Sequence, residues 1–339
     1  MISLALFNNK GGVGKTTLTY HLAHMMQRIG HRVLAVDLDP QSNLTAMFLD
    51  PEEIERLWGA DTELFGGSVP SDSSGRSLNR TIGDAVRPLA EQTGGVRLID
   101  ATEMIDGLWL LPGSLDLSPF EDKLAKAWLE SLASDIGAIR VMTAFHQVIQ
   151  HAARQVRADV VLIDVASNLG AINRAALLSA DTVLMPLAAD MFSLLGLHNL
   201  GPRLAHWRQK WQRIVVPDAP VDLTVPKGTM DPIGYVVMQP SIRLDRPVRA
   251  YQRWLSRIPA VYAESVLPDG GDRADHRIAT IRTFRSLMPL AHDARKPMFD
   301  LKASDGAIGS TQKYVQLCYR EFEEVARRVL DRLGIGSPQ

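Results

Sequence analysis

The most chemically informative stretch of the sequence is NNKGGVGKTT, residues 8–17, which follows one short apolar run. A glycine-rich turn between a buried strand and a helix points backbone N–H groups inward, beside the positive end of the helix dipole, and so forms a setting for phosphate. Lys15 is placed to reach the β- and γ-phosphates of a nucleotide, and the Thr16 hydroxyl is placed to ligate Mg²⁺. The stretch therefore predicts a site for a nucleotide with Mg²⁺.

The loop departs from the common pattern G-x-x-x-x-G-K-[ST], because Asn9 replaces its first glycine and Lys10 follows. The resulting K-G-G-x-G-K-T is the deviant Walker A motif, and with it the sequence resembles the ParA/MinD family of ATPases. The resemblance implies ATP, and it implies that Lys10 crosses a dimer interface to neutralise charge on phosphates held by the other subunit. The alternative is a solvated loop lysine. The nucleotide contacts expected in this loop are Lys10, Gly11, Gly12, Val13, Gly14, Lys15, Thr16 and Thr17.

Carboxylates close two further apolar runs. Asp37 and Asp39 lie in VLAVDLDPQSN, which is similar to the segment that the family carries after its second strand. The resemblance implies that Asp39 orients the attacking water and that Asp37 supports Mg²⁺. Asp164 ends the apolar run of VVLIDVASNLG, which is similar to the family's Walker B region, and is expected to hold Mg²⁺ through water. Two prolines usually follow this aspartate in the family, and Val165 and Ala166 replace them here.

The resemblance continues towards the C-terminus. Met238 and Pro240 end a predicted strand where such proteins often contact the base, although a strand-end proline is often only a stop. The segment 288–324, which includes Lys296 and Pro297, resembles the family's last strand and helix. Met238 and Pro240 complete the set of expected nucleotide contacts.

Apolar runs alternate with helical patterns along the chain, which predicts an α/β fold with a doubly wound, mostly parallel sheet covered on both faces. The active site is expected at the C-terminal ends of the strands. A helix is expected over 16–30. The expected strands are 2–7, 32–39, 95–100, 108–113, 159–166, 181–188 and 232–240.

The domain organisation follows from the length of 339 residues and from two Gly-, Ser- or Pro-rich stretches. We expect a single P-loop ATPase domain over 1–339 with surface inserts at about 59–81 and 205–232. Because the sequence starts at its first strand, no N-terminal helix-turn-helix domain is expected. Trp207 and Trp211, four residues apart, are typical of a core-facing helix stripe.

Composition excludes several classes of protein. The lone cysteine, Cys318, excludes an intrachain disulfide and the paired cysteines of a nitrogenase-reductase-like electron carrier, and a buried position is expected for it. No apolar stretch reaches transmembrane length, and no signal peptide precedes the first strand. A cytoplasmic protein is therefore expected.

Charge is distributed unevenly. Residues 1–200 hold 15 Lys and Arg against 23 Asp and Glu, whereas residues 201–339 hold 22 against 15. Arginines recur every four residues within RLDRPVRAYQRWLSRIPAVY, and two more follow in IRTFRSL. The resemblance places DNA-contacting arginines in these regions, and the alternative is an ordinary solvated basic face. The candidate DNA-binding residues are Arg249, Arg253, Arg257, Arg282 and Arg285.

The resemblance implies a ParA-like ATPase that forms an ATP-dependent homodimer, binds DNA non-specifically and positions a plasmid, chromosome or protein cargo. It implies slow basal turnover, stimulation by a ParB-like or other protein partner, and association with the nucleoid. A MinD-like membrane ATPase is an alternative, but the polar face of the tail YREFEEVARRVLDRLGIGSPQ mixes acidic and basic residues, so a helix packed on the core is expected. A biosynthetic enzyme of the dethiobiotin synthetase or amidoligase type is the other alternative.

Overall fold

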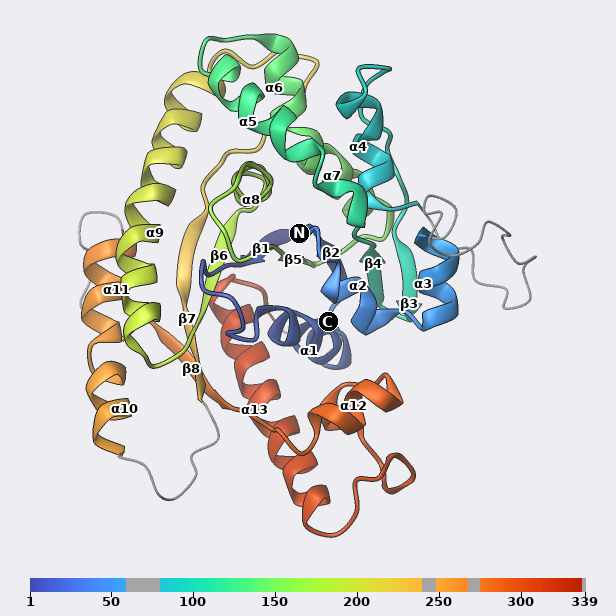
Figure 1. The fold of residues 1–339 in the computed structure, drawn as a ribbon, viewed down its shortest axis with the longest axis vertical. Helices are drawn as coiled ribbons and strands as arrows, with labels where there is room; N and C mark the ends of the chain where they lie inside the picture. Colours follow the sequence, from blue (N-terminus) through green and yellow to red (C-terminus); the bar gives the residue numbers. More distant parts are fainter. Residues whose placement is uncertain (59–79, 240–247, 268–274, 337–339) are drawn as a thin grey trace.

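The computed structural model describes residues 1–58, 80–239, 248–267 and 275–336. Within them, eight strands form one sheet in the order β3-β4-β2-β5-β1-β6-β7-β8 (Figure 1). Neighbouring strands are parallel, except for the antiparallel pair β3 and β4. This confirms the predicted doubly wound α/β fold. The strands are β1 (Ile2–Leu6), β2 (Val33–Asp37), β3 (Thr102–Ile105), β4 (Leu108–Leu111), β5 (Val160–Asp164), β6 (Thr182–Leu187), β7 (Asp231–Gln239) and β8 (Arg277–Arg282).

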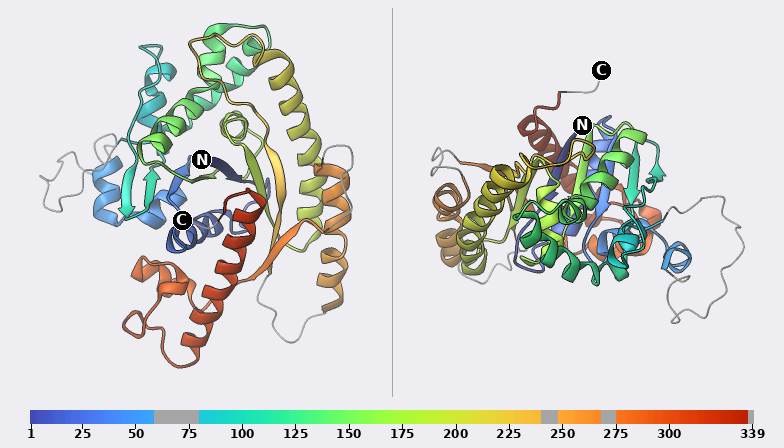
Figure 2. Two further views of the ribbon diagram at one scale, coloured as in Figure 1. Left: turned by 180° about the vertical axis from the view of Figure 1, so that it is seen from behind. Right: turned by 90° about the horizontal axis from the view of Figure 1, so that it is seen from above.

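Helices cover both faces of the sheet, as Figures 1 and 2 show. Successive side chains of a strand point to opposite faces, so the buried strands supply two cores. In β5, Val160 and Leu162 join one core and Val161 and Ile163 join the other. The first core packs against α1 (Lys15–Arg28), α2 (Asn43–Phe48), α3 (Pro51–Trp58), α12 (Met288–Ala294) and α13 (Ser310–Arg332). The second packs against α4 (Ile82–Ala90), α5 (Phe120–Ser131), α6 (Ile136–Met142), α7 (Ala144–Gln155), α8 (Ala171–Leu178), α9 (Met191–Lys210), α10 (Val248–Leu255) and α11 (Ile258–Val266).

The strand predicted over 95–100 is wrong. These residues run beside α4, where Arg97 N donates to Ala85 O at 2.9 Å, and Leu98 is exposed. The strand begins instead at Thr102 and forms a hairpin with β4 around Gly107, which has φ of 82°. A tight hairpin of this kind favours glycine at the residue with positive φ. The apolar run at 95–100 therefore marks an approach to the hairpin and not a strand.

The last strand also lies elsewhere than the sequence predicted. Residues 288–324, all described, contain α12, two short 3-10 turns and the start of α13, and none of them is in a strand. Pro289 stands in the first turn of α12, where its missing N–H has no partner to lose. The last strand is β8, which pairs with β7 before this segment begins.

Helix α13 packs on the core as expected. Phe322, Val325 and Val329 are buried against the face of the sheet that carries α1, and Cys318 is buried beside them. Burial of this face leaves α13 no free apolar stripe of the kind that an interfacial membrane helix needs. Among the described residues, no helix combines the length and the apolar character required to cross a bilayer.

The two predicted inserts have different outcomes. Residues 59–79 of the first lie outside the described part of the chain. In the second, α9 continues to Lys210 and a π-helical turn follows (Trp211–Val215), so only the residues from there to β7 are irregular. Trp211 is fully buried and its Nε1 donates to Pro226 O at 2.8 Å, which ties this excursion to the core. Trp207 is also buried, so the predicted core stripe is confirmed.

Candidate functional site

The glycine-rich loop lies where the carboxyl ends of three central strands meet. Leu6 at the end of β1 pairs with Asp164 at the end of β5, and Asp37 at the end of β2 pairs with Asp164 from the other side. Parallel strands bring their carboxyl ends to one edge, where ligands of doubly wound sheets bind. The loop between β1 and α1 crosses this edge. Gly14, the N-cap of α1, has φ of 87°, a left-handed conformation that favours glycine.

A cavity of about 620 Å³ opens at this edge. It is lined by seven of the predicted residues, namely Gly11, Gly12, Gly14, Lys15, Thr16, Thr17 and Asp39. Its other lining residues were not predicted as nucleotide contacts, and they are Gln41, Asn43, Ala46, Met47, Ala166, Ser167, Asn168 and His292. All of these except Ala46, Met47 and His292 belong to the two motif segments quoted for Asp39 and Asp164, so proximity to those motifs was a usable signal. His292 lies on α12, and nothing in its sequence context pointed to the cavity.

The pair Thr16 and Asp164 forms a candidate Mg²⁺ site beside the cavity. Thr16 Oγ1 donates to Asp164 Oδ2 at 2.7 Å, and Thr19 Oγ1 lies 3.2 Å from Asp164 Oδ1. One hydroxyl and one carboxylate fit Mg²⁺, which is usually bound by one or two carboxylates together with phosphate oxygens and waters. In the described part of the chain, no three His, Cys, Asp or Glu side chains cluster as an all-protein metal cage. The donor set therefore fits a metal that arrives with phosphate.

Asp37 lies on the strand next to Asp164 and bonds to the segment that follows β2. Its Oδ2 accepts from Thr45 N at 2.8 Å and from Thr45 Oγ1 at 2.7 Å, and its Oδ1 accepts from Asp39 N at 3.2 Å. The carboxylate is fully buried. Asp37 thus holds the start of α2 and the turn that carries Asp39, while its role near Mg²⁺ stays a prediction.

Burial changes the acidity of both buried carboxyls. Burial, and secondly the nearby Asp164, raise the pKa of Asp37 to about 7 although hydrogen bonds from Thr45 and Asp39 oppose the shift. Burial likewise raises the pKa of Asp164 to about 6, against hydrogen bonding from Thr16 and the charge of Lys15. A carboxyl with a raised pKa stays protonated to a higher pH than a solvated one.

Binding of a Mg²⁺-nucleotide should therefore weaken in mild acid. Above pH 6 the Asp164 carboxylate is ionised and attracts the cation, and below pH 6 it is protonated, so we expect affinity to fall by about tenfold per pH unit there. Titrating the Kd for ATP between pH 5 and pH 8, with Mg²⁺ and with EDTA, measures this. A profile that is equally steep in EDTA would place the acidic group elsewhere.

Lys15 is buried and turned towards the segment after Asp164. Its Nζ donates to Ser167 Oγ, and only 6% of the residue is exposed. Burial lowers the pKa of Lys15, while the carboxylates of Asp164 and Asp39 oppose that shift. Asp39 is held at the cavity wall by its turn, where Gln41 N donates to Asp39 Oδ1 at 2.9 Å. A cation and a carboxylate thus face one cavity.

Lys10 does not turn towards this cavity. Its Nζ forms an ion pair with Asp190, the N-cap of α9, and lies 5.9 Å from the centre of the Phe192 ring. Asp190 Oδ1 also accepts from Ser193 N at 2.9 Å, which fixes the carboxylate that receives Lys10. In the single chain the extra lysine therefore sits at the start of α9.

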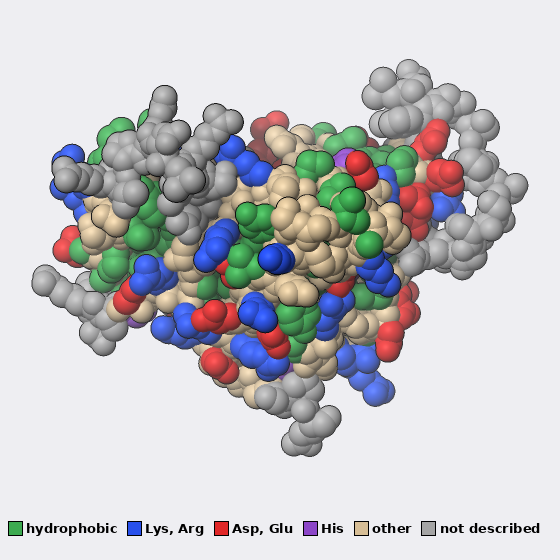
Figure 3. Space-filling model, turned by 90° about the horizontal axis from the view of Figure 1, so that it is seen from below, with side chains coloured by type: hydrophobic (Ala, Val, Ile, Leu, Met, Phe, Trp, Pro, Cys, Tyr) green, Lys and Arg blue, Asp and Glu red, His purple; other side chains and the backbone are tan. Residues whose placement is uncertain are grey.

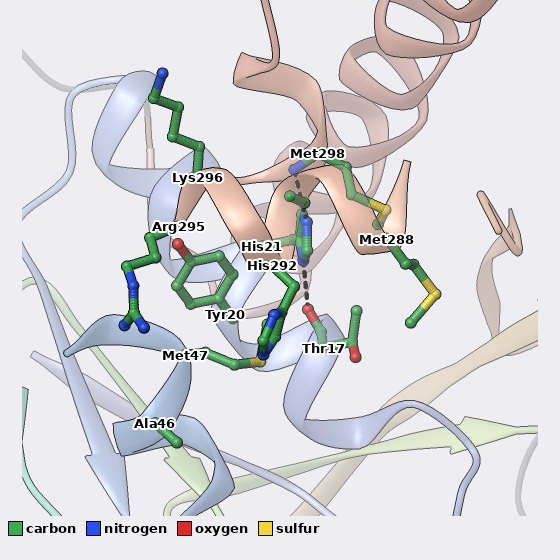
Figure 4. Close-up of a pocket in the computed structure, with 11 residues that line it drawn as sticks. Thr17, Tyr20, His21, Ala46, Met47, Met288, His292, Arg295, Lys296 and Met298 are labelled. Carbon is green, nitrogen blue, oxygen red and sulfur yellow. Dashed lines mark hydrogen bonds between the residues drawn. The ribbon is translucent and has the colours of Figure 1, made fainter. Parts of the chain in front are cut away.

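A second, smaller cavity of about 200 Å³ adjoins the first (Figure 4). The two share Thr17, Ala46, Met47 and His292. Figure 4 shows Tyr20, Met47 and His292 close together between α1, α2 and α12. His21 fixes the α1 wall, because its Nδ1 lies 2.7 Å from Thr17 O and its Nε2 accepts from Met298 N at 3.0 Å.

The predicted base contacts have different outcomes. Pro240 lies outside the described residues. The side chain of Met238 reaches the phosphate loop: a Cβ atom added to Gly14 would lie 3.2 Å from Cε of Met238. The structure brings Met238 to the loop, and its contact with a base stays a prediction.

Comparison with known proteins identifies the family. A family model described as an AAA domain matches residues 1–215. The chain is 33% identical over 200 residues to a candidate replication protein A of Rhizobium rhizogenes, which covers 58% of this chain and 42% of that protein. It is 29% identical over 197 residues to the chromosome-partitioning ATPase Soj of Thermus thermophilus, a match that covers 58% of this chain and 59% of that protein. The chain belongs to the ParA-type P-loop ATPases of this AAA family. It spans about half the length of the curated relatives that it matches.

A solved structure resembles this ParA-type ATPase over almost the whole chain, including the part after residue 215 that the family model does not match. Protein DIP2308 of Corynebacterium diphtheriae superimposes with a TM-score of 0.70 at 25% identity, covering 98% of this chain and 99% of that protein. The similarity includes the region after residue 215, where β7, β8 and α13 lie. The resemblance to the ParA/MinD family is therefore confirmed, together with the fold.

Arg253 and Arg257, which recur four residues apart, do not lie on one continuous helix. Helix α10 ends at Leu255, and Arg257 is the N-cap of α11, because Pro259 would break a continuous helix but is accepted in a first turn. Arg253 and Arg257 are exposed, and their Cζ atoms lie 5.5 and 5.7 Å from the Trp254 ring. The side chain of Arg249 lies outside the described part.

The second basic region is partly neutralised. Arg282 and Arg285 are both exposed, and Arg282 Nε pairs with Glu321 of α13 at 3.1 Å. Figure 3 views the molecule from the side on which α10, α12 and the adjoining end of α13 project, and there Lys and Arg side chains are interspersed with Asp and Glu. All four described candidates are exposed, but Arg282 already has an acidic partner, so the exposed candidates without an acidic partner in the described part of the chain are Arg253, Arg257 and Arg285.

Proposed function

We propose that this chain is an ATP-hydrolysing positioning ATPase that closes as a homodimer on ATP, binds DNA without sequence preference and releases it after hydrolysis. The observation that carries the proposal is the phosphate cavity, where Lys15 and the Thr16–Asp164 pair face Asp39. Lys15 and Thr16 would hold the phosphates and Mg²⁺, and Asp39 would orient the attacking water. The chromosome-partitioning names of two relatives support a DNA cargo.

The surroundings of Lys10 support a dimer. The start of α9, next to the Lys10–Asp190 pair, exposes Met191, Phe192 and Leu195, whose exposed fractions are 45%, 64% and 51%. Adjacent exposed apolar side chains beside a functional loop fit a protein interface. In a dimer of this chain, Lys10 would leave Asp190 for the partner's phosphates. Basal turnover is then slow because the single chain keeps this lysine at α9.

Association with the nucleoid follows if the exposed arginines bind DNA, and a ParB-like or other protein would stimulate hydrolysis. The test is binding to random-sequence duplex DNA with ATP, with ADP and with no nucleotide, across a salt series. We expect tight, salt-sensitive binding with ATP alone, because each phosphate contact releases a counterion. No binding in any nucleotide state would contradict the DNA-dependent function.

Replacing Arg253, Arg257 and Arg285 together by alanine should flatten the salt dependence. The slope of log K against log salt should fall by about one unit for each phosphate contact removed. The matched control replaces Arg140, Arg154 and Arg157 of the α6–α7 region, which are remote from α10. If both triple variants keep the wild-type slope, the three arginines are only a solvated face.

A biosynthetic P-loop enzyme is the second candidate, and the cavity beside the phosphate site favours it. A second substrate would occupy the space between Tyr20, Met47 and Met298. That enzyme would hydrolyse ATP slowly unless the second substrate were present, and DNA would not affect it. The DNA titration therefore separates the two candidates.

A further inference from the structure

The loop that follows Asp164 is held from behind by one buried side chain, Asn173 in the first turn of α8. Its Oδ1 accepts from Ala166 N at 3.1 Å, and its Nδ2 donates to Ala166 O at 2.9 Å. The same Nδ2 donates to Asn168 O at 2.8 Å. The amide thus clamps the main chain at two points, one on each side of Ser167.

Ser167 is the residue between these two points, and it faces the phosphate cavity. It lines the cavity together with Asn168, and its Oγ accepts from Lys15 Nζ. Because both neighbouring residues are fixed, the hydroxyl of Ser167 has a defined position relative to the loop lysine. The contact joins two segments that are 152 residues apart in the chain.

This clamp stands where the chain departs from its family. Prolines after the Walker B aspartate would restrict φ directly, and this chain has Val165 and Ala166 there. Here the restraint comes from hydrogen bonds to Asn173. The helix that carries Asn173 is anchored in turn, since Glu121 of α5 accepts from Ala171 N and, at 2.8 Å, from Ile172 N.

We propose that Ser167 distinguishes a nucleoside triphosphate from a diphosphate, and that Asn173 is its positioning residue. The inference rests on the proposed ATP site. Lys15 reaches the β- and γ-phosphates, so a hydroxyl in contact with its ammonium lies at the terminal end of the phosphate chain. Ser167 Oγ accepts from Lys15 through a lone pair, so its O–H can at the same time donate to the terminal phosphate. ADP has no γ-phosphate to accept that bond.

The experiment measures the Kd for ATP and for ADP, with Mg²⁺, for the wild type, Ser167→Ala, Asn173→Ala and the double variant. A hydrogen bond to a charged group is commonly worth about tenfold or more in affinity. Ser167→Ala should therefore weaken ATP by about tenfold and ADP by less than about twofold. Asn173→Ala should show the same selective loss, and the double variant should match the more affected single variant, because the two residues act through one contact.

The control is Ser179→Ala, which removes another buried hydrogen bond at the far end of α8, from Ser179 Oγ to Ala175 O. It should lower the melting temperature to a similar extent and leave the ratio of the two Kd values unchanged. Equal weakening of ATP and ADP by Ser167→Ala, or multiplied losses in the double variant, would overturn the proposal. If Asn173→Ala does not fold, Ser167→Ala alone still decides whether the hydroxyl discriminates. A wild type that binds neither nucleotide would instead overturn the proposed function.

Discussion

Replacing Lys15 by alanine should abolish ATP binding in the range where the wild type saturates. Its ammonium is buried at the cavity wall, and no other described lysine or arginine lines that cavity. Removing a charge-assisted contact to phosphate from a buried site costs about 3–5 kcal/mol, or more than a hundredfold in Kd. Isothermal titration with ATP and Mg²⁺ measures the loss.

The matched control for Lys15 is Lys126→Ala, since Lys126 is exposed on α5 and pairs only with Glu130 among the contacts recorded for it. It should bind ATP as the wild type does. Retained binding by Lys15→Ala would show that the glycine-rich loop does not hold the nucleotide through this lysine. A melting temperature close to that of the wild type would show that the variant is folded.

Replacing Lys10 by alanine should leave ATP binding within about twofold and reduce hydrolysis on the order of a thousandfold, which is the lower end of what a cation supplied in trans contributes. The physical reason is that Lys10 lies at α9 in the single chain and is proposed to reach phosphates only across a dimer. Phosphate release gives the rate, and light scattering with ATP gives the oligomeric state. Normal hydrolysis by a monomeric Lys10→Ala protein would exclude a role in trans.

Asp190→Asn provides the comparison for Lys10. Asparagine keeps the N-cap acceptor for Ser193 N but removes the charge that holds Lys10. We expect this variant to dimerise with ATP at least as readily as the wild type, because Lys10 no longer has to leave an ion pair. Loss of dimerisation in Asp190→Asn would instead assign Asp190 itself to the interface.

Local pattern determined much of the site and the fold. The apolar runs predicted β1, β2, β4, β5, β6 and β7, and the family resemblance of the motif segments placed Lys15, Thr16 and Asp164 at one edge of a parallel sheet. This was possible because a buried parallel strand must be apolar throughout and because a phosphate loop needs its glycines in a fixed order. The strand predicted at 95–100 was wrong because a short apolar run does not show which element its backbone N–H groups will donate to. Here Arg97 N donates to a carbonyl of helix α4 and not to a neighbouring strand.

Only the tertiary structure decided which side chains pair over long distances. Lys10 meets Asp190, Arg282 meets Glu321, and Ser167 meets Lys15, in each case through segments that are far apart in the sequence. A solvated cation and an ion-paired cation have the same sequence signature, because the pairing depends on how helices pack on the sheet. The sequence by itself thus determined the P-loop α/β fold of this chain and the position of its phosphate loop. The packing of α8, α9 and α12 decided where Lys10 rests, what clamps the segment after Asp164, and that His292 reaches the cavity.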